Sequence, residues 1–355
     1  MAVYIGVDFH ARSQVIGYLT TKDGEVRHCK LDPMKDNLRE FFTQFEDEVI
    51  VGFEASGYTD WFEQLLEELG HQVWVGDAAE IRRMARRRQK NDWRDADLIL
   101  ELMVNNRFPR VHRQSSESRE VLRQVRYRHR LVKLRTVAKN SLQAISLRSG
   151  LSLRWRLHSR QGRQQLNELS FSSEIVTQVK ELNELIDDLG KKIKRVETWL
   201  KDAASKDSRV MLLQTHPGIG LLTSLGLVHT LAPVSRFSTA RKVTAYLGLD
   251  PVEDSSGERV RIGSISKQGS RLVRFLVIEA GHIAVRYDDD LKKFYRRLVL
   301  RHGNNARARA TAKVAVGRKL LIRSFIMLRD GIDYDEFVRR GVEVRSSRLA
   351  HRPNA

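Results

Sequence analysis

The feature that most restricts the fold of this chain is a regular stripe of apolar residues between positions 175 and 200. Its members are spaced by four and three residues in strict alternation: Ile175, Val179, Leu182, Ile186, Leu189, Ile193, Val196 and Leu200. This heptad spacing makes one face of a long helix apolar, and such a face is buried against another helix. That second helix belongs either to the same chain or to a second copy, because the stripe does not identify its partner.

A second long helix is predicted over residues 118–148. Its apolar residues recur mostly at three- and four-residue steps, and its other faces are rich in arginine and lysine. If this helix covers the heptad stripe, the two form a helical hairpin; the alternative is an intermolecular coiled coil. Helices are also predicted over 270–286, 291–301 and 306–329.

The first part of the chain has a different pattern. Short apolar or alternating runs predict strands at 3–7, 13–21, 26–31, 49–53 and 71–75. Helical spacing predicts helices at 35–45, 61–69 and about 93–105, with Gly70 ending the second. Three consecutive strands followed by alternating helices and strands predict a mixed sheet flanked by helices.

Charge follows the same division. The 355 residues include 63 Lys and Arg against 44 Asp and Glu, a net charge of +19. Residues 1–80 contribute 6 basic and 16 acidic residues (net −10), residues 81–163 contribute 23 and 6 (net +17), and the rest contribute 34 and 22 (net +12). This excess indicates a polyanionic partner, either nucleic acid or an anionic membrane surface. One cysteine, no leader-like N-terminus and no membrane-length apolar run favour a soluble cytoplasmic protein without a membrane partner.

Four carboxylates are placed where they could bind metal. Asp8 and Glu54 each end a predicted strand, and Asp92 and Asp95 lie three residues apart at a helix start. If the two strands are neighbours, Asp8 and Glu54 lie side by side at one edge of the sheet. Clustered carboxylates need a cation such as Mg²⁺, and two ions would suit phosphoryl displacement. The structural alternatives are a turn at Asp8 and a helix cap at Asp92 and Asp95.

Two later segments also bear on function. The turn Pro217-Gly218-Ile219-Gly220 precedes an apolar helix, and its backbone N–H groups could bind phosphate as helix-hairpin-helix modules do. The alternative is an ordinary interhelical turn. Residues 255–269 are rich in glycine and serine and interrupt the helical periodicity; taken alone, they indicate only a loop. Paired cysteines, His-Glu-x-x-His and nucleotide-binding glycine loops are lacking, which argues against zinc, dinucleotide or ATP sites.

Together these motifs resemble the DEDD transposases of insertion sequences, the group related to the pilin-gene invertase and described as bridge-RNA-guided recombinases. The matching segments follow the family's order along nearly the whole chain: Ile5-Gly6-Val7-Asp8, Phe53-Glu54-Ala55-Ser56-Gly57-Tyr58, Lys90-Asn91-Asp92-Trp93-Arg94-Asp95-Ala96, the turn at 217–220 and Leu247-Gly248-Leu249-Asp250-Pro251. Asn91 stands where the family usually has threonine.

The resemblance implies a division into domains. These would be a RuvC-like domain with a ribonuclease H fold at 1–110, a basic helical and coiled-coil region at 111–205 and a mainly helical transposase domain at 206–340. The polar tail at 341–355 is expected to be disordered. The implied setting is a bacterial or archaeal cytoplasm, with action at the nucleoid.

The resemblance also implies a catalytic set. Asp8, Glu54, Asp92 and Asp95 would bind Mg²⁺, for which Mn²⁺ could substitute, and Ser256 would be the nucleophile. Ser255 is the alternative nucleophile, because the two serines are adjacent. Implied partners are DNA at the element ends and target, a noncoding guide RNA and further copies in a dimer or tetramer.

Nucleic acid is expected on the basic segments, because positive side chains contact phosphate without reading sequence. The candidate residues are Arg82, Arg83, Arg86, Arg87, Arg88, Arg123, Arg126, Arg130, Lys133, Gly218, Gly220, Arg259, Arg261 and Lys267. The expected function is a DNA transposase or recombinase that cuts and rejoins strands through a serine–phosphate intermediate. The alternatives are a metal-dependent, structure-selective nuclease of the Holliday-junction resolvase type, without that intermediate, and a non-catalytic RNA- or DNA-binding protein.

Overall fold

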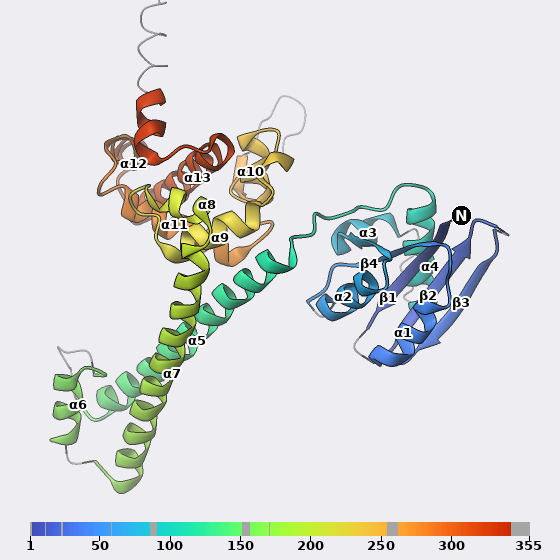
Figure 1. Ribbon diagram of the computed structural model, residues 1–355. Helices are drawn as coiled ribbons and strands as arrows, with labels where there is room; N and C mark the ends of the chain where they lie inside the picture. Colours follow the sequence, from blue (N-terminus) through green and yellow to red (C-terminus); the bar gives the residue numbers. More distant parts are fainter. Residues whose placement is uncertain are drawn as a thin grey trace, which may run out of the picture. The chain divides into compact units, whose positions relative to one another are not determined.

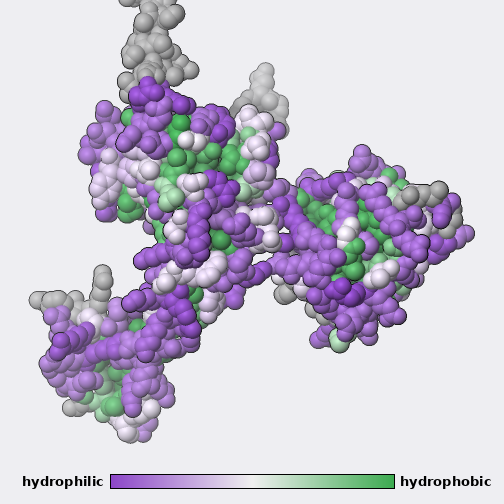
Figure 2. All heavy atoms as spheres, in the orientation of Figure 1, coloured by the Kyte–Doolittle hydropathy of each residue, from purple (hydrophilic) through white to green (hydrophobic). Residues whose placement is uncertain are grey.

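The computed structural model describes residues 2–10, 12–22, 24–57, 59–85, 91–150, 157–169, 171–253 and 262–341 (Figure 1). The chain divides into two compact units, 1–113 and 114–355. Hydrophilic side chains cover most of the face of the molecule seen in Figure 2, and apolar side chains show in smaller areas. None of the helices in the described ranges combines the length and the apolar character that a membrane span requires.

The first unit is built on a five-stranded mixed sheet, as the sequence predicts. Its strands are β1 (Ala2–Phe9), β2 (Gln14–Thr20), β3 (Val26–Leu31), β4 (Glu48–Glu54) and β5 (Gln72–Gly76). Their order across the sheet is β3-β2-β1-β4-β5. The first three strands are antiparallel, whereas β4 and β5 run parallel to β1. The first and fourth strands are therefore neighbours, which was the condition for bringing Asp8 and Glu54 together.

Helices α1 (Lys35–Thr43), α2 (Asp60–Glu68), α3 (Ala78–Met84) and α4 (Asp92–Val104) complete this unit. The buried side chains of α1 and α2 form a cluster with Val7 and Phe53 of the sheet, whereas α3 and α4 share a separate cluster with Ile50 and Trp74. Alternate residues of the strands thus serve two cores. The sequence did not predict α3, which has seven residues and one fully buried apolar side chain, Ile81.

The second unit begins with a long helical hairpin. Helices α5 (Ser116–Arg148) and α7 (Ser173–Ser205) pack along each other, and α6 (Arg160–Asn167), which was not predicted, lies between them in sequence. Six of the eight heptad residues of α7 are buried, and they cluster with α5 side chains such as Leu131 and Leu142. The Arg128 guanidinium on α5 donates to Glu197 Oε1 at 2.6 and 2.9 Å. The structure therefore pairs the heptad stripe with a helix of the same chain.

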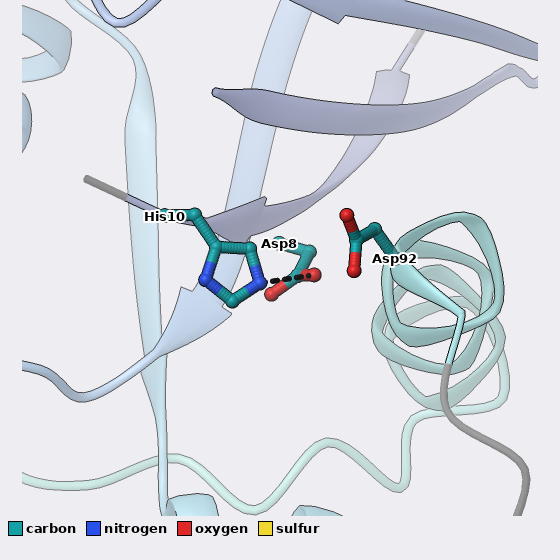
Figure 3. A group of neighbouring side chains, drawn as sticks. All are labelled: Asp8, His10 and Asp92. Carbon is teal, nitrogen blue, oxygen red and sulfur yellow. Dashed lines mark hydrogen bonds and ion pairs between the residues drawn. The ribbon is translucent and has the colours of Figure 1, made fainter. Parts of the chain in front are cut away.

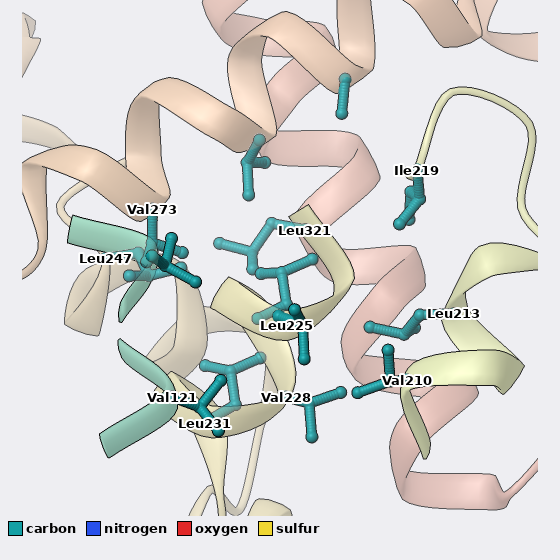
Figure 4. Close-up of a cluster of buried hydrophobic side chains, with 14 of the residues drawn as sticks. Val121, Val210, Leu213, Ile219, Leu225, Val228, Leu231, Leu247, Val273 and Leu321 are labelled. Carbon is teal, nitrogen blue, oxygen red and sulfur yellow. The ribbon is translucent and has the colours of Figure 1, made fainter. Parts of the chain in front are cut away.

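The rest of this unit is a helical bundle around an apolar centre. It contains α8 (Ser208–Gln214), α9 (Leu221–Leu231), α10 (Ala240–Tyr246), α11 (Arg271–Ala284), α12 (Asp289–Arg301) and α13 (Ala306–Asp330). Side chains from several of these helices and from α5 meet in one core (Figure 4). The helices predicted at 270–286, 291–301 and 306–329 are confirmed. Two short strands, β6 (Pro251–Glu253) and β7 (Ile262–Ile265), were not predicted.

Candidate metal centre

The predicted carboxylates of the strands lie at one edge of the sheet. Asp8 is the penultimate residue of β1 and Glu54 is the last residue of β4. The parallel register pairs Val7 with Phe53, so the two acids occupy the next positions of adjacent strands. Both side chains are partly buried. The Arg82 guanidinium on α3 lies near Glu54, with its Nη2 4.0 Å from Glu54 Oε2.

Helix α4 brings the other two predicted acids to this edge. Asn91 caps the helix by accepting a hydrogen bond from the Trp93 backbone N–H at 3.3 Å, and Asp92 is the first helical residue. The Asp92 carboxylate points toward Asp8 (Figure 3). Asp95, one turn along, is close enough for its charge to act on Asp8. The structure thus places Asp92 beside Asp8, and Asp95 follows one turn further along the same helix.

Two glycines explain how α4 comes so close to the sheet. A Cβ added to Gly6 of β1 would lie 2.6 Å from the Ala96 carbonyl oxygen and 2.7 Å from the Leu100 nitrogen. Gly52 of β4, paired with Gly6 in the register, faces the side chain of Met103. Since neither strand has a side chain at these positions, the α4 backbone can lie against β1. The first turn of α4 then lies near the end of that strand.

The structure adds His10, which is not among the predicted site residues. Its Nε2 donates to Asp8 Oδ2 at 3.0 Å, and ligand atoms of Asp8, His10 and Asp92 all lie within 4.8 Å of one another (Figure 3). The buried Gln14 side chain donates to the His10 carbonyl oxygen at 3.0 Å, which fixes the turn between β1 and β2. The available signal was the spacing Asp8-x-His10, because side chains two apart in extended chain share a face.

The electrostatics of this cluster favour a bound cation. Burial raises the pKa of Asp8, and the charges of Asp95 and Asp92 act in the same direction, whereas the nearby His10 opposes them. A carboxylate whose ionised form is disfavoured in this way is stabilised by an adjacent positive ion. Two carboxylates and an imidazole are ligands that divalent ions accept, and Asp92 and His10 are exposed to solvent. The residues present therefore fit a divalent cation.

The four predicted basic residues of α5 share one exposed face. Arg123, Arg126, Arg130 and Lys133 follow one another at three- and four-residue steps and are all exposed. Arg123 pairs with Glu120, whereas in the described structure no carboxylate lies within 4.0 Å of Arg126, Arg130 or Lys133. Tyr127, on the same side of the helix, is 44% exposed. This face combines unpaired positive charge with an accessible ring.

The other predicted basic residues are divided between described and undescribed segments. Arg82 and Arg83 lie on α3, where Arg83 pairs with Glu80. Lys267 is exposed and adopts a left-handed conformation (φ 59°), with its backbone N–H bound to the Gly248 carbonyl oxygen. The remaining predictions lie outside the described residues: Arg86, Arg87, Arg88, Arg259, Arg261, Ser256 and its neighbour Ser255.

The predicted phosphate turn at 217–220 joins α8 to α9. Gly218 has a φ of 92°, and a Cβ there would lie 2.6 Å from the Ala284 backbone nitrogen on α11. Its lack of a side chain is therefore needed for helix packing. Gly220, the N-cap of α9, has no heavy atom near its would-be Cβ. Of the two glycines, only Gly220 leaves open space beside the helix start.

Comparison with known protein families gives two matches. Residues 5–148 match a DEDD transposase family named for IS110, and residues 210–296 match the transposase family IS116/IS110/IS902. The first match contains the metal-centre candidates Asp8, His10 and Asp92, and the second contains the turn at 217–220.

Several curated proteins are similar over most of the chain. A probable family 20 transposase of Pseudomonas aeruginosa is 28% identical over 73% of this chain and 77% of its own length. The transposase for insertion sequence element IS1328 of Yersinia enterocolitica is 25% identical over 74% and 80%. The transposase for insertion sequence element IS1111A of Coxiella burnetii is 27% identical over 61% and 62%.

Proposed function

Because the chain belongs to the IS110/IS116 family of DEDD transposases, and DNA transposition is the activity of that family, we propose that Asp8, His10 and Asp92 form its divalent-metal centre. The observation that carries this proposal is the approach of their ligand atoms to within 4.8 Å of one another. Mg²⁺ is the proposed ion, with Mn²⁺ as a substitute, since both accept carboxylate oxygens.

The first unit is proposed to be a RuvC-like domain with a ribonuclease H fold. Support comes from the strand order β3-β2-β1-β4-β5 and from the carboxylates at the ends of β1 and β4. When bound, the cation supplies charge stabilisation to phosphate oxygens during strand cleavage. The chain's own residues hold it there: Asp8 and Asp92 offer carboxylates, and His10 fixes the orientation of Asp8. Glu54 and Asp95 complete the proposed acidic set.

Ser256 is proposed as the nucleophile that cuts and rejoins DNA. Its oxygen would bond to phosphorus as a DNA oxygen leaves and takes up a proton, and rejoining would reverse these changes with a new DNA hydroxyl. The proposal rests on the family motif at Leu247–Pro251 and on the glycine that follows this serine. Arg259, Arg261 and Lys267 would offset charge on the phosphate.

The noncoding guide RNA and the dimer or tetramer are also proposals. The α5 face at Arg123, Arg126, Arg130 and Lys133 is the proposed RNA or DNA surface, with Arg82, Arg83, Arg86, Arg87, Arg88 and the turn glycines Gly218 and Gly220 as further contacts. Support comes from the absence of carboxylates near three of these α5 residues in the described structure and from exposed Tyr127, on which a base could stack.

A strand-exchange assay with purified protein and DNA carrying the element ends tests the metal centre. We expect Asp92→Asn to lower the rate by at least about a hundredfold, because it removes a ligand carboxylate. Asp97→Asn is the matched control on the same helix, since Asp97 pairs with His28 at 2.5 Å, away from the cluster. Equal activity of the two variants would remove the metal-centre proposal.

Ser256→Ala in the same assay separates the covalent mechanism from its rivals. Loss of strand exchange in a folded variant supports the serine mechanism. If exchange persists while Asp92→Asn abolishes it, the chain acts as a metal-dependent nuclease of the resolvase type. If neither substitution changes the rate of strand exchange, neither Asp92 nor Ser256 takes part in the chemistry, and both proposals are wrong. A wild-type protein that binds this DNA without exchanging strands would be a non-catalytic binding protein.

A further inference from the structure

A second basic surface lies far along the chain from α5, on α12 and the start of α13. Between Lys292 and Lys313 there are eight lysines and arginines and no aspartate or glutamate. None of these eight residues is among the predicted nucleic-acid contacts. Their concentration within 22 residues needs an explanation beyond solubility, because like charges at helical spacing repel one another.

The α12 residues of this surface form one exposed stripe. Lys293, Arg296, Arg297 and Arg301 are all exposed; Lys293, Arg297 and Arg301 recur at four-residue steps, and Arg296 lies three residues after Lys293. The opposite side of the helix is buried, where Leu291 and Val299 face the bundle. The helix is therefore amphipathic, and its outward face presents four guanidinium or ammonium groups to solvent.

The start of α13 extends the same surface. Arg307 and Arg309 lie in its first turn and are exposed, and a short turn at 302–304 joins them to the end of α12. The N-terminus of a helix carries partial positive charge, so basic side chains there oppose the helix dipole and cost stability. Asn305 caps the helix by accepting from the Ala308 backbone N–H at 2.8 Å. The arginines thus do not stabilise the helix start.

These charges have little neutralisation within the protein. Across the described residues, no carboxylate lies within 4.0 Å of Lys293, Arg296, Arg301 or Arg307. The acids closest in sequence are at the other end of α12, where Asp288 pairs with the buried Arg323. An anion from outside the chain is the complementary partner.

We propose that this α12–α13 surface, defined by Lys293, Arg296, Arg297, Arg301, Arg307 and Arg309, binds the phosphate backbone of duplex DNA. The inference deepens the proposed function, on which it rests, by naming a contact surface for the DNA substrate. Duplex is favoured over single strands because neither aromatic ring of α12 is free to stack on a base. Phe294 and Tyr295 are only partly exposed, and Arg297 and Lys319 lie over Phe294.

The test is equilibrium binding of the full-length protein to a 30-base-pair duplex of unrelated sequence, without divalent metal. The variant combines Arg296→Gln, Arg297→Gln and Arg301→Gln, which keep helix-forming residues on exposed positions. The matched control removes the same charge through Lys192→Gln, Lys206→Gln and Arg339→Gln. Each of these three pairs with an acid of its own helix or segment: Asp188, Asp202 and Glu336.

We expect the arginine variant to bind the duplex at least about tenfold more weakly than the control at 0.1 M salt. The slope of log K against log salt should also fall by about two to three, because each lost phosphate contact removes roughly 0.9. Replacing the same three arginines by lysine should restore most of the affinity, because the charge is kept. Circular dichroism and thermal melting establish that each variant is folded.

Three outcomes overturn the proposal. One is an affinity and salt slope equal to those of the control. Another is a loss of affinity for single-stranded DNA as large as the loss for duplex DNA. The third is a larger loss of affinity for duplex RNA than for duplex DNA, which would assign the surface to RNA. Because the assay uses no metal and no strand exchange, it remains informative if the metal centre or the serine mechanism proves wrong, and a failure here leaves both of those intact.

Discussion

At the scale of single residues, His10 shows what a motif comparison leaves out. The four acids were predicted from their positions at the ends of strands and helices. His10 lies in a turn and does not end any predicted strand or helix. Its role depends on the bend between β1 and β2, where Gln14 holds the His10 carbonyl, and on the approach of α4. Neither of these is encoded in a local pattern, so the spacing Asp8-x-His10 alone did not distinguish His10 from the other histidines.

Substitution of His10 tests its place in the proposed metal centre. We expect His10→Ala to weaken Mn²⁺ binding by about tenfold to a hundredfold, the range typical of losing a residue that orients or completes a metal site. The measurement is Mn²⁺ titration followed by electron paramagnetic resonance. His28→Ala is the control, because His28 contacts Asp97 outside the cluster. Identical Mn²⁺ affinity in the two variants would place His10 outside the metal centre.

His216 makes the second unit sensitive to acid. Its side chain is fully buried, and this burial lowers its pKa from 6.5 to about 4. Between these values the unfolded chain binds a proton that the folded chain does not, so stability is lost as pH falls from about 6.5 toward about 4. We expect His216→Gln, although less stable at pH 7, to lose less unfolding free energy between pH 7 and pH 5. Urea titrations at the two pH values measure the unfolding free energy. The prediction is contradicted if the variant and the wild type lose the same amount of it between pH 7 and pH 5.

At the scale of elements, apolar periodicity located long helices and central strands but not short elements. The α5–α7 pair and the strands β1 and β4 have enough apolar positions for their period to be clear. By contrast, α3 and α6 have seven and eight residues, and β6 and β7 have three and four. Such elements form because the surrounding structure holds them, and a local pattern of so few residues cannot indicate this. The partner of the heptad stripe was also undetermined until α5 was seen against it.

Substitution of Gly6 tests how the packing of α4 positions the proposed metal centre. We expect Gly6→Ala to destabilise the first unit by about 1–3 kcal/mol and to weaken Mn²⁺ binding, because the new methyl group would press on backbone atoms of α4 and displace Asp92. Gly52→Ala is the comparison, since its methyl group would meet the flexible Met103 side chain. That variant should lose stability while keeping most of its Mn²⁺ affinity. Equal loss of affinity in both would argue against positioning by Gly6.

At the scale of the whole molecule, the division of charge found in the sequence corresponds to a division of structure. The acidic stretch, residues 1–80, forms the five-stranded sheet, whereas the exposed basic faces described above lie on α5 and α12 of the second unit. The fold class and the main carboxylates were predictable because both depend on regular patterns. Beyond the last helix of this unit, Arg113 pairs with Glu63 and Glu67 of α2 and ties the end of the unit to that helix.

A fragment of residues 1–113 is expected to fold alone, whereas one of residues 1–105 should be less stable by roughly 3–5 kcal/mol. The longer fragment keeps Arg113, whose Nε lies 2.6 Å from the buried Glu63 carboxylate, and the hydrogen bond from Val111 N–H to the Val75 carbonyl oxygen. Without Arg113 a buried negative charge loses its partner. Urea unfolding followed by circular dichroism compares the fragments, and equal midpoints would show that the segment 106–113 is dispensable.

The central position of β1 has a consequence for how the proposed metal centre is lost. β1 is hydrogen-bonded on both sides, to β2 and β4, so its amide protons belong among those that exchange with solvent only when the whole domain unfolds. Asp92 lies instead in the first turn of a helix, where local unfolding requires the least free energy. The centre is therefore assembled from one of the most protected segments of the domain and one of the least protected, and partial opening can separate its ligands while the sheet remains intact.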